Sequence, residues 1–312
     1  MRKLKTLKIN DINHLSKLIK TPQQKLLQIS GAISVNEDDF FYSNKIQKKS
    51  GIGEREINPP IHELKVIQRN INQLLQRLLI HDIIKGGVKS RSHIDHANKH
   101  IKKKIVITMD ISDFFPSVKS ERVYNIFYKR LGCCPKIANI LTRLTIYHDC
   151  LPQGSPTSGI IAVLATEKLS LRLLDLAEKN NATFSIYMDD IAFSANYNLS
   201  ESFINKANTI IEDERYKINE SKTEIMLTTE TEQIITGIKV NDGLDIPFKS
   251  YSILCNEINS INTQITTKQH RSIIGKLNYW TQCKIKSSKV IHLKRRYLKI
   301  YNHQINNNSQ NA

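Results

Sequence analysis

Cysteine is scarce in this chain, and the pattern of its cysteines argues against two kinds of scaffold. The 312 residues contain five cysteines, an odd number, and none of them forms a Cys-x-x-Cys pair. The pattern therefore favours neither a disulfide framework nor a structural zinc site, and it is typical of a reduced, cytoplasmic protein. The five are Cys133, Cys134, Cys150, Cys255 and Cys283.

A long hydrophobic run is lacking near the N-terminus. Residues 1–25 are basic and partly helical in pattern, without the apolar core of a secretory signal or the length of a membrane span. We therefore expect no membrane partner for this segment.

Acidic residues are fewer than basic ones in the whole chain and are absent from the C-terminal part. There are 46 Lys and Arg residues against 29 Asp and Glu, a formal net charge of +17, and after Glu257 ten basic residues and no acidic one. Basic side chains that neutralise phosphates gain affinity by releasing counterions, so nucleic acid is the simplest partner. Segments 271–280 and 290–298 keep apolar residues at spacings of three and four, which predicts amphipathic helices with basic outer faces.

Two adjacent carboxylates, Asp189 and Asp190, lie between two segments of alternating apolar and polar residues, 182–186 and 191–194. The pattern predicts a β-hairpin with both carboxylates at its tip. Adjacent like charges repel, and a hard divalent cation such as Mg²⁺ would neutralise them. The alternative is that this pair only forms an exposed turn, for which Asp is a common residue.

A third carboxylate, Asp110, ends the apolar and β-branched run 105–109, which predicts a buried strand. Pro116 interrupts regular structure before a helix expected near Ser120. Carboxylates from different strands are what a two-metal phosphoryl-transfer site requires, with one ion activating the attacking hydroxyl and the other stabilising the leaving oxygen. Asp110, Asp189 and Asp190 would supply that set.

Local patterns predict further elements. Apolar residues at helical spacing over 62–85, after Pro59-Pro60, predict a core helix, and the loop 86–92 is glycine-rich and basic enough to cradle phosphate. A second helix is expected over 157–179, entered by a turn in which Gly154 allows a ligand to approach closely and Ser155 or Thr157 caps the helix. Segments 40–42 and 48–57 are interpreted as two short strands around a glycine-rich turn.

Five ordered motifs resemble the palm of reverse transcriptases: Asp110-x-x-Asp113-Phe114-Phe115, Leu151-Pro152-Gln153-Gly154-Ser155-Pro156-Thr157-Ser158, Tyr187-Met188-Asp189-Asp190, Asn219-Glu220-Ser221-Lys222-Thr223 and Ile235-Thr236-Gly237. The resemblance implies an α+β right-hand polymerase. The expected division is an N-terminal extension with fingers over 1–104, palm mainly over 105–240, and a basic helical thumb over 241–312 that is frayed from Asn302.

Within that family, two elements are similar to those of bacterial retron enzymes. His96-Ala97-Asn98-Lys99-His100 resembles their Asn-Ala-x-x-His element, with His96 in place of the first Asn. Ile235-Thr236-Gly237 resembles their Val-Thr-Gly element, with Ile235 in place of Val. Without the surrounding motifs, His96 and His100 would be read as ordinary helix or loop residues.

The resemblance also implies a role for individual residues. Two Mg²⁺ ions would be held by Asp110, Asp189, Asp190 and the backbone carbonyl of Ile111, with Lys222 protonating the departing pyrophosphate or orienting the triphosphate. The implied nucleotide site consists of Phe115, Gln153, Gly154 and Arg55. Template or RNA contacts are implied for Arg91, His96, Asn98, His100, Thr236, Gly237, Lys294, Arg295 and Arg296.

Several of these residues could instead have a purely structural role. Phe115 would lie under the sugar and exclude a ribose 2′-hydroxyl, but Phe114 and Phe115 are also candidates for the core. Lys222 is alternatively an exposed turn residue, and Gln153-Gly154 only a helix entry. The aromatic residues of the basic tail either stack on bases or pack internally: Tyr279, Trp280 and Tyr297.

The implied function is RNA-directed DNA synthesis by a retron enzyme. It would use dNTPs and a cognate structured noncoding RNA, start from an RNA 2′-hydroxyl, and leave branched RNA-DNA (multicopy single-stranded DNA). Such enzymes are associated with anti-phage defence beside a separate effector, a toxin. The alternatives are another bacterial reverse transcriptase class (defence-associated, diversity-generating, intron-encoded or abortive-infection-type), or an RNA-binding scaffold that restrains a toxin.

Overall fold

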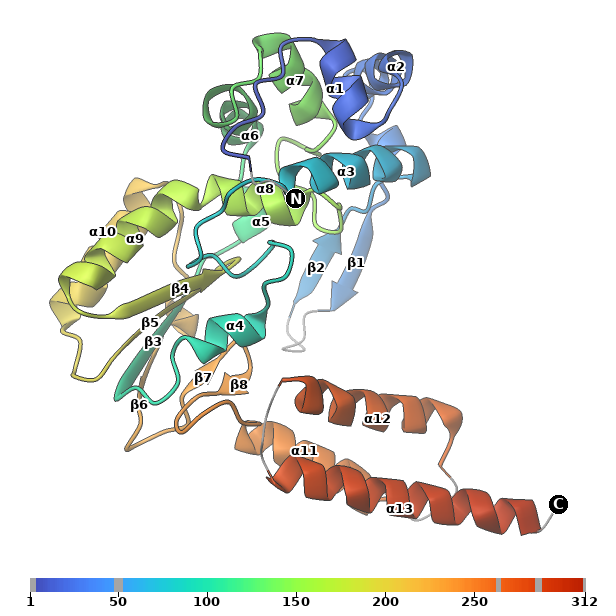
Figure 1. Cartoon of the computed structure of the whole chain (residues 1–312), viewed down its shortest axis with the longest axis vertical. Coiled ribbons are helices and arrows are strands. Elements are labelled where there is room, and N and C mark those ends of the chain that lie inside the picture. The colour runs from blue at the N-terminus through green and yellow to red at the C-terminus, as the bar shows by residue number, and fades with distance from the viewer. Residues whose placement is uncertain (1–3, 48–52, 262–264, 284–287, 311–312) are drawn as a thin grey trace. The chain divides into compact units, whose positions relative to one another are not determined.

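The protein combines helices with small antiparallel sheets, as the α+β prediction requires. The computed structural model describes residues 4–47, 53–261, 265–283 and 288–310. The strands form one four-stranded sheet of order β4-β5-β3-β6 and two hairpins, β1-β2 and β7-β8 (Figure 1). Their bounds are β1 Asn44–Gln47, β2 Glu54–Ile57, β3 Ile105–Asp110, β4 Thr183–Tyr187, β5 Asp190–Ala195, β6 Glu224–Leu227, β7 Ile234–Ile235 and β8 Ile238–Lys239.

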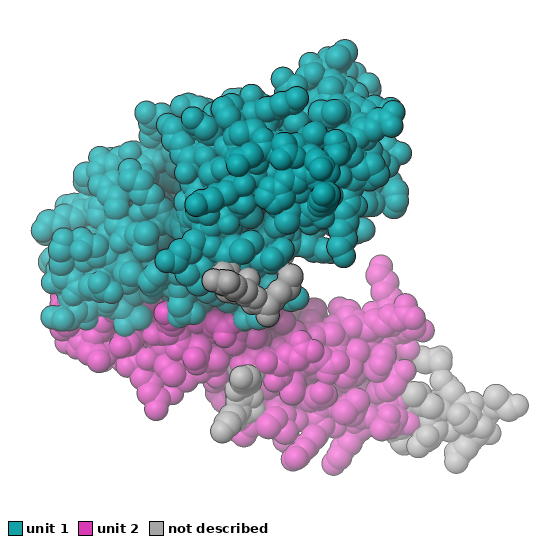
Figure 2. All heavy atoms as spheres, turned by 45° about the horizontal axis from the view of Figure 1, so that its top comes forward, with its two compact units in different colours: residues 1–92, 109–191, 200–223 teal, residues 93–108, 192–199, 224–312 magenta. Residues whose placement is uncertain are grey.

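The chain divides into two compact units, coloured separately in Figure 2. Unit 1 comprises residues 1–92, 109–191 and 200–223, and unit 2 comprises 93–108, 192–199 and 224–312. The boundary passes through β3 and β5. The two units therefore interleave along the chain.

The helices of unit 1 surround its part of the sheet, and α9 packs on β4 and on α10. The core of unit 1 includes Leu15, Leu64, Phe127 and Ile191, each of which is nearly inaccessible to solvent. The helices are α1 Ile12–Ile19, α2 Gln23–Ile33, η1 Asp38–Phe40, α3 His62–Leu75, α5 Phe114–Ser117, α6 Ser120–Asn125, η2 Ile126–Arg130, α7 Pro135–Arg143, α8 Ser158–Ala165, α9 Glu167–Lys179, α10 Glu201–Asp213 and η3 Glu220–Lys222.

Unit 2 has a core of its own, which joins its strands to three C-terminal helices. Trp280 and Tyr297 lie in this core with Val106, Ala192 and Ile238. The helices of the unit are α4 His93–Asn98, α11 Phe248–Asn259, α12 Thr267–Gln282 and α13 Ser288–Gln310. The two predicted basic helices are therefore present, and two of the three aromatic residues singled out in them serve the core. The backbone is helical to Gln310, so the tail that was expected to be frayed from Asn302 onward is helical over most of its length.

The hairpin and the Asp110 strand are confirmed, but several other predictions need correction. The helix expected over 62–85 ends at Leu75, where the side chain of Gln76 turns to bond with the backbone of Gly87 and Lys89. The strand expected at 40–42 is instead a 3-10 turn followed by a single bridge between Phe41 and Pro60. The first strand of that hairpin is β1, and residues 48–52 of its predicted turn lie outside the described residues.

The helix expected over 157–179 is two helices, with a break at Thr166. The hydroxyl of Thr166 donates to the carbonyls of Ala162 and Val163, a local bond that competes with the helical ladder. Thr157, one of the two expected caps, is the N-cap residue of α8, but its side chain makes no capping bond. Among the described residues, no helix is long and apolar enough to cross a membrane.

Candidate active site

Asp110 lies at the end of β3, a strand whose residues are mostly buried. The strand forms because β-branched and apolar side chains pack well on a sheet covered on both faces. The backbone amide of Asn219 donates to the carbonyl of Asp110 at 2.8 Å, and the amide of Ser112 donates to the carbonyl of Lys217 at 2.8 Å. Segment 217–219 therefore holds the backbone on both sides of Ile111.

The second pair of carboxylates lies at the turn between β4 and β5. Met188 occupies the left-handed region with a φ of 60°, and Asp190 is the first residue of β5. The amide of Ile111 donates to the carbonyl of Asp189 at 3.2 Å. This bond brings the hairpin turn beside the end of β3, so the structure brings the three predicted carboxylates together.

The charges of the three carboxylates affect one another. Burial, followed by repulsion from Asp189 and Asp110, raises the pKa of Asp190 to about 7. Burial, and then the charge of Asp110, also raises the pKa of Asp189, against a lowering by Lys222 and Arg55. Partly desolvated like charges favour protonation unless a cation neutralises them. The site is therefore built to attract positive charge.

Lys222 supplies such a charge within the protein itself. Its Nζ lies 3.1 Å from Oδ1 and 3.0 Å from Oδ2 of Asp110. Lys222 ends the 3-10 helix η3, and its side chain is largely exposed whereas that of Asp110 is largely covered. The predicted lysine thus reaches the carboxylates directly and is more than an isolated turn residue.

The carboxylates fit a hard divalent cation by their chemistry. Within the described residues no group of three or more His, Cys, Asp or Glu side chains is arranged to hold a metal ion as it stands. In this arrangement the Lys222 ammonium occupies the position beside Asp110 that a metal ion would take. Carboxylate oxygens are the ligands that hard divalent cations prefer, and they bind such an ion in their deprotonated form.

The two adjacent phenylalanines have different environments. Phe114 is 3% exposed and belongs to the core, whereas Phe115 is only partly buried. The two rings are 5.5 Å apart, and the ring of Tyr216 lies 6.2 Å from that of Phe114. Of the two interpretations considered for the pair, Phe114 takes the structural one and leaves Phe115 accessible to a ligand.

Gln153 and Gly154 are tied to the strand that carries Arg55. The amide of Asn58 donates to the carbonyl of Gln153 at 2.7 Å. Gly154 has a φ of 97°, and a Cβ there would lie 2.8 Å from the side chain of Ile57. The glycine therefore permits close approach of the protein's own chain, where a ligand had been expected. Arg55 is exposed on β2, and its charge is felt at Asp189.

Gly86 is a site residue that the sequence patterns did not identify. A Cβ at Gly86 would lie 2.5 Å from the backbone nitrogen and 2.6 Å from Cγ of Met188. The amide of Lys85 donates to the carbonyl of Ile186 at 2.7 Å, so this segment runs beside β4. The glycine-rich loop, interpreted as a phosphate cradle, thus packs directly against the turn that carries Asp189 and Asp190. Only the closeness of this loop to the hairpin, which the sequence does not show, would have revealed it.

Arg91 uses its guanidinium to hold the same loop. It donates to the backbone carbonyls of Ile80, His81 and Ile84 at 2.7–2.9 Å. These bonds satisfy the polar backbone between α3 and the glycines. The predicted template contact of Arg91 therefore competes with a structural role that the guanidinium already fills.

His96 and His100 are buried in unit 2, which does not support the predicted contact with RNA. Both rings are 0% exposed, and Nδ1 of His100 lies 2.7 Å from the hydroxyl of Ser194. Burial, with smaller contributions from His96, Lys103 and Lys99, lowers the pKa of His100 well below its usual value. Asn98 of the same element is exposed and remains accessible to a ligand.

The remaining predicted RNA contacts also lie in unit 2. Thr236 and Gly237 form the two-residue turn between β7 and β8, with φ values of 45° and 80°. A β-branched residue with positive φ is strained, and the hydroxyl of Thr236 donates to the carbonyl of His93 at 3.3 Å. On α13, Arg295 and Arg296 are exposed and Lys294 donates to Asn278 at 2.9 Å.

Residues 46–291 match the family model described as reverse transcriptase (RNA-dependent DNA polymerase). The chain belongs to this family. The match confirms the predicted reverse transcriptase family and the right-hand polymerase fold.

Curated relatives narrow the family further. The Retron Se72 reverse transcriptase of Salmonella heidelberg is 27% identical over 76% of this chain and 63% of its own length. The Retron Ec86 reverse transcriptase of Escherichia coli is 28% identical over 85% of this chain and 88% of its own length. The Retron Ec73 reverse transcriptase of Escherichia coli is 31% identical over 62% of this chain and 67% of its own length. The chain thus spans less than two thirds of the first relative and most of the second. The predicted retron-type reverse transcriptase is confirmed at this level.

Proposed function

We propose that this reverse transcriptase serves a retron and copies a structured noncoding RNA into DNA from dNTPs. The observation that carries the polymerase assignment is the meeting of Asp110 with the Asp189-Asp190 turn, secured by the bond from the Ile111 amide to the Asp189 carbonyl. The similarity to three retron reverse transcriptases supports the retron assignment.

In this proposal the three carboxylates and the backbone carbonyl of Ile111 hold two Mg²⁺ ions. Bound there, the ions would acidify the attacking hydroxyl and stabilise the leaving oxygen. Phe115 and Gln153-Gly154 orient the sugar and base, and Arg55 faces the phosphates from β2. Lys222, which bonds to Asp110 in this structure, would be free to orient or protonate the departing pyrophosphate once a metal ion neutralised that carboxylate.

The retron assignment adds a primer and a product. Synthesis would start from a 2′-hydroxyl of the noncoding RNA and leave a branched RNA-DNA molecule. Exposed Arg295 and Arg296 on α13, with Asn98 and the Thr236-Gly237 turn, are the proposed RNA contacts of unit 2. We further propose a cytoplasmic location, with which the five free cysteines agree, and a role in anti-phage defence beside a toxin effector.

Sequencing of the nucleic acid that copurifies with the full chain tests the proposal. The expected result is one RNA species joined through a 2′–5′ branch to a short DNA. A linear DNA product, or RNA without DNA, would contradict the retron assignment while leaving the polymerase assignment intact.

An Asp189→Asn variant separates catalysis from RNA binding. It should retain the copurifying RNA and lose the DNA, because the amide cannot neutralise a divalent cation. A matched Asp175→Asn variant alters an exposed carboxylate on α9 and should leave both RNA and DNA unchanged. Loss of RNA from the Asp189 variant alone would instead assign the turn to RNA binding.

A further inference from the structure

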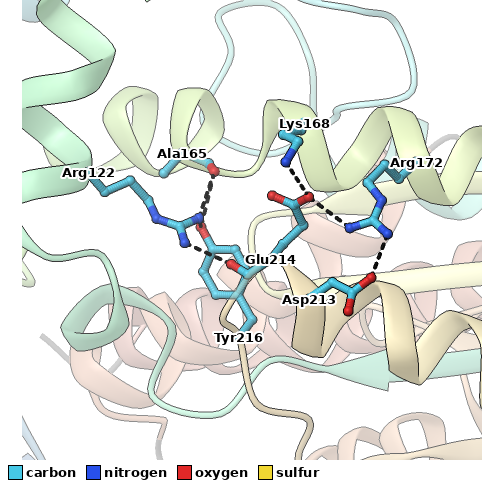
Figure 3. Close-up of polar contacts among 7 residues, drawn as sticks. All are labelled: Arg122, Ala165, Lys168, Arg172, Asp213, Glu214 and Tyr216. Atoms are coloured by element: carbon cyan, nitrogen blue, oxygen red, sulfur yellow. Dashed lines mark hydrogen bonds and ion pairs between the residues drawn. The ribbon is translucent and has the colours of Figure 1, made fainter.

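Buried Tyr216 and partly buried Arg122 form a polar cluster in unit 1, shown in Figure 3. Tyr216 is 2% exposed, and the guanidinium carbon of Arg122 lies 4.6 Å from the centre of its ring. Nη1 of Arg122 donates to the Tyr216 hydroxyl at 2.9 Å, and the hydroxyl donates to the carbonyl of Ala165 at 3.1 Å. A charged group in such a place requires a complete set of partners.

The cluster joins three separate parts of unit 1. Arg122 lies on α6, Ala165 is the last residue of α8, and Tyr216 follows α10. Arg122 also donates to the backbone carbonyl of Glu214 at 2.7 Å and to that of Ala165 at 3.4 Å. Carbonyls at helix C-termini lack helical partners, so the guanidinium satisfies groups that would otherwise be unbonded.

The chain leads from Tyr216 straight to the carboxylates. The next residue, Lys217, accepts a bond from the Ser112 amide, Ile218 pairs with Ile111, and the Asn219 amide donates to the Asp110 carbonyl. Three residues after Asn219 comes Lys222, which contacts the carboxylate of Asp110. Displacement of Tyr216 would therefore move both the backbone support of Asp110 and its lysine.

The ring of Tyr216 also lies close to the two adjacent phenylalanines. It lies 6.2 Å from the ring of Phe114, which lies 5.5 Å from that of Phe115. Because interiors are close-packed, a shift of Tyr216 is passed on to Phe114 and from there to Phe115.

We propose that Arg122 and Tyr216 are positioning residues of the polymerase site, which set the place of Asp110 and Lys222 through segment 217–219 and the place of Phe115 through Phe114. The inference rests on the proposed function of the three carboxylates. It assigns to this cluster an effect on cation binding and on sugar selection, beyond a contribution to stability.

Arg172 provides a matched control, because it belongs to the outer end of the same network. It donates to the carboxylates of Glu214 at 2.8 Å and Asp213 at 2.7 Å, and Lys168 also pairs with Glu214 (Figure 3). Arg172 contacts side chains of these residues, whereas Arg122 holds the backbone and the Tyr216 ring. The same substitution at both positions therefore separates the positioning cluster from the general ion network.

The experiment compares Arg122→Lys, Tyr216→Phe and Arg172→Lys in the full chain. We expect Arg122→Lys to slow single-turnover dNTP addition by roughly 10- to 100-fold, since small misplacements of reacting groups are costly. It should also raise the half-saturating Mn²⁺ concentration several-fold, measured by electron paramagnetic resonance without substrate, and weaken the preference for dNTP over rNTP. Arg172→Lys should stay within about two-fold of wild type, because Arg172 contacts only the side chains of Glu214 and Asp213 and a lysine keeps the charge that pairs with them.

Tyr216→Phe keeps the ring and removes only the hydroxyl, so it serves if Arg122→Lys does not fold. It should raise the half-saturating Mn²⁺ concentration and preserve sugar selection, because the ring still contacts Phe114. A lowered melting temperature with wild-type Mn²⁺ binding and sugar preference in both variants would overturn the proposal. Wild-type DNA synthesis by Asp189→Asn would instead overturn the proposed function on which it rests.

Discussion

The ammonium of Lys222 bonds to both carboxylate oxygens of Asp110, at 3.0 Å and 3.1 Å. One residue thus neutralises the carboxylate that ends β3. A divalent ion held by Asp110 would compete with this ammonium, because each requires the same oxygens. Removal of the lysine is therefore predicted to have opposite effects on cation binding and on the rate of catalysis.

Replacement of Lys222 by Met should tighten binding of Mn²⁺ and slow catalysis. Cation affinity should rise several-fold because the competing ammonium is gone, whereas the rate should fall by roughly 10²–10⁴-fold if the lysine acts as a general acid. Equilibrium Mn²⁺ binding and single-turnover rates measure the two effects. Lys217→Met removes the same charge from an exposed neighbour and should change neither. Weaker Mn²⁺ binding by Lys222→Met would contradict this account.

Gly86→Ala should impair catalysis far more than it impairs folding. Its Cβ would lie 2.5 Å from the Met188 backbone, so the turn that carries Asp189 must move. We expect roughly a 100-fold loss of rate and a loss of about 1–3 kcal/mol of unfolding free energy. Gly31→Ala on α2 has open space around its Cβ and should add about 0.4–1 kcal/mol with unchanged rate. Chemical denaturation and primer extension test both, and a fully active Gly86→Ala enzyme would refute the close packing.

The two phenylalanines should respond differently to truncation. Phe115→Ala should admit rNTPs and leave stability nearly unchanged, because this side chain is only partly buried. Phe114→Ala should cost about 3–5 kcal/mol of unfolding free energy, because it empties a core position. Competition between dNTP and rNTP, followed by denaturant unfolding, measures the difference. Unchanged sugar selection in Phe115→Ala would remove that residue from the nucleotide site.

His100 should make unit 2 sensitive to acid. Burial lowers the pKa of its imidazole in the folded state, so below the ordinary pKa of about 6.5 the unfolded chain binds the extra proton. The neutral His100 therefore does not reduce the free energy of unfolding above about pH 6.5. This free energy decreases as the pH falls from that value towards the lower pKa of His100 in the folded state. Amide exchange of unit 2 between pH 5 and pH 8 should show this loss, and His100→Gln should reduce it. His14→Gln, at an exposed position, should leave the profile unchanged.

The sequence alone determined which motifs this protein carries and in what order they follow one another along the chain. Alternation around Tyr187-Met188-Asp189-Asp190 and the apolar run before Asp110 are local properties, and both strands formed as predicted. Spacing identified the basic helices α12 and α13 in the same way. Such features depend on near neighbours and on the two periods of regular structure, so they are visible without a fold.

Tertiary structure decided which neighbours each side chain meets. It placed Phe114 in the core and left Phe115 only partly buried, and it buried His96 and His100, which the motif had suggested for RNA. It also placed Gly86 under Met188. These outcomes depend on close packing between segments far apart in sequence, and residue spacing carries no information about such contacts.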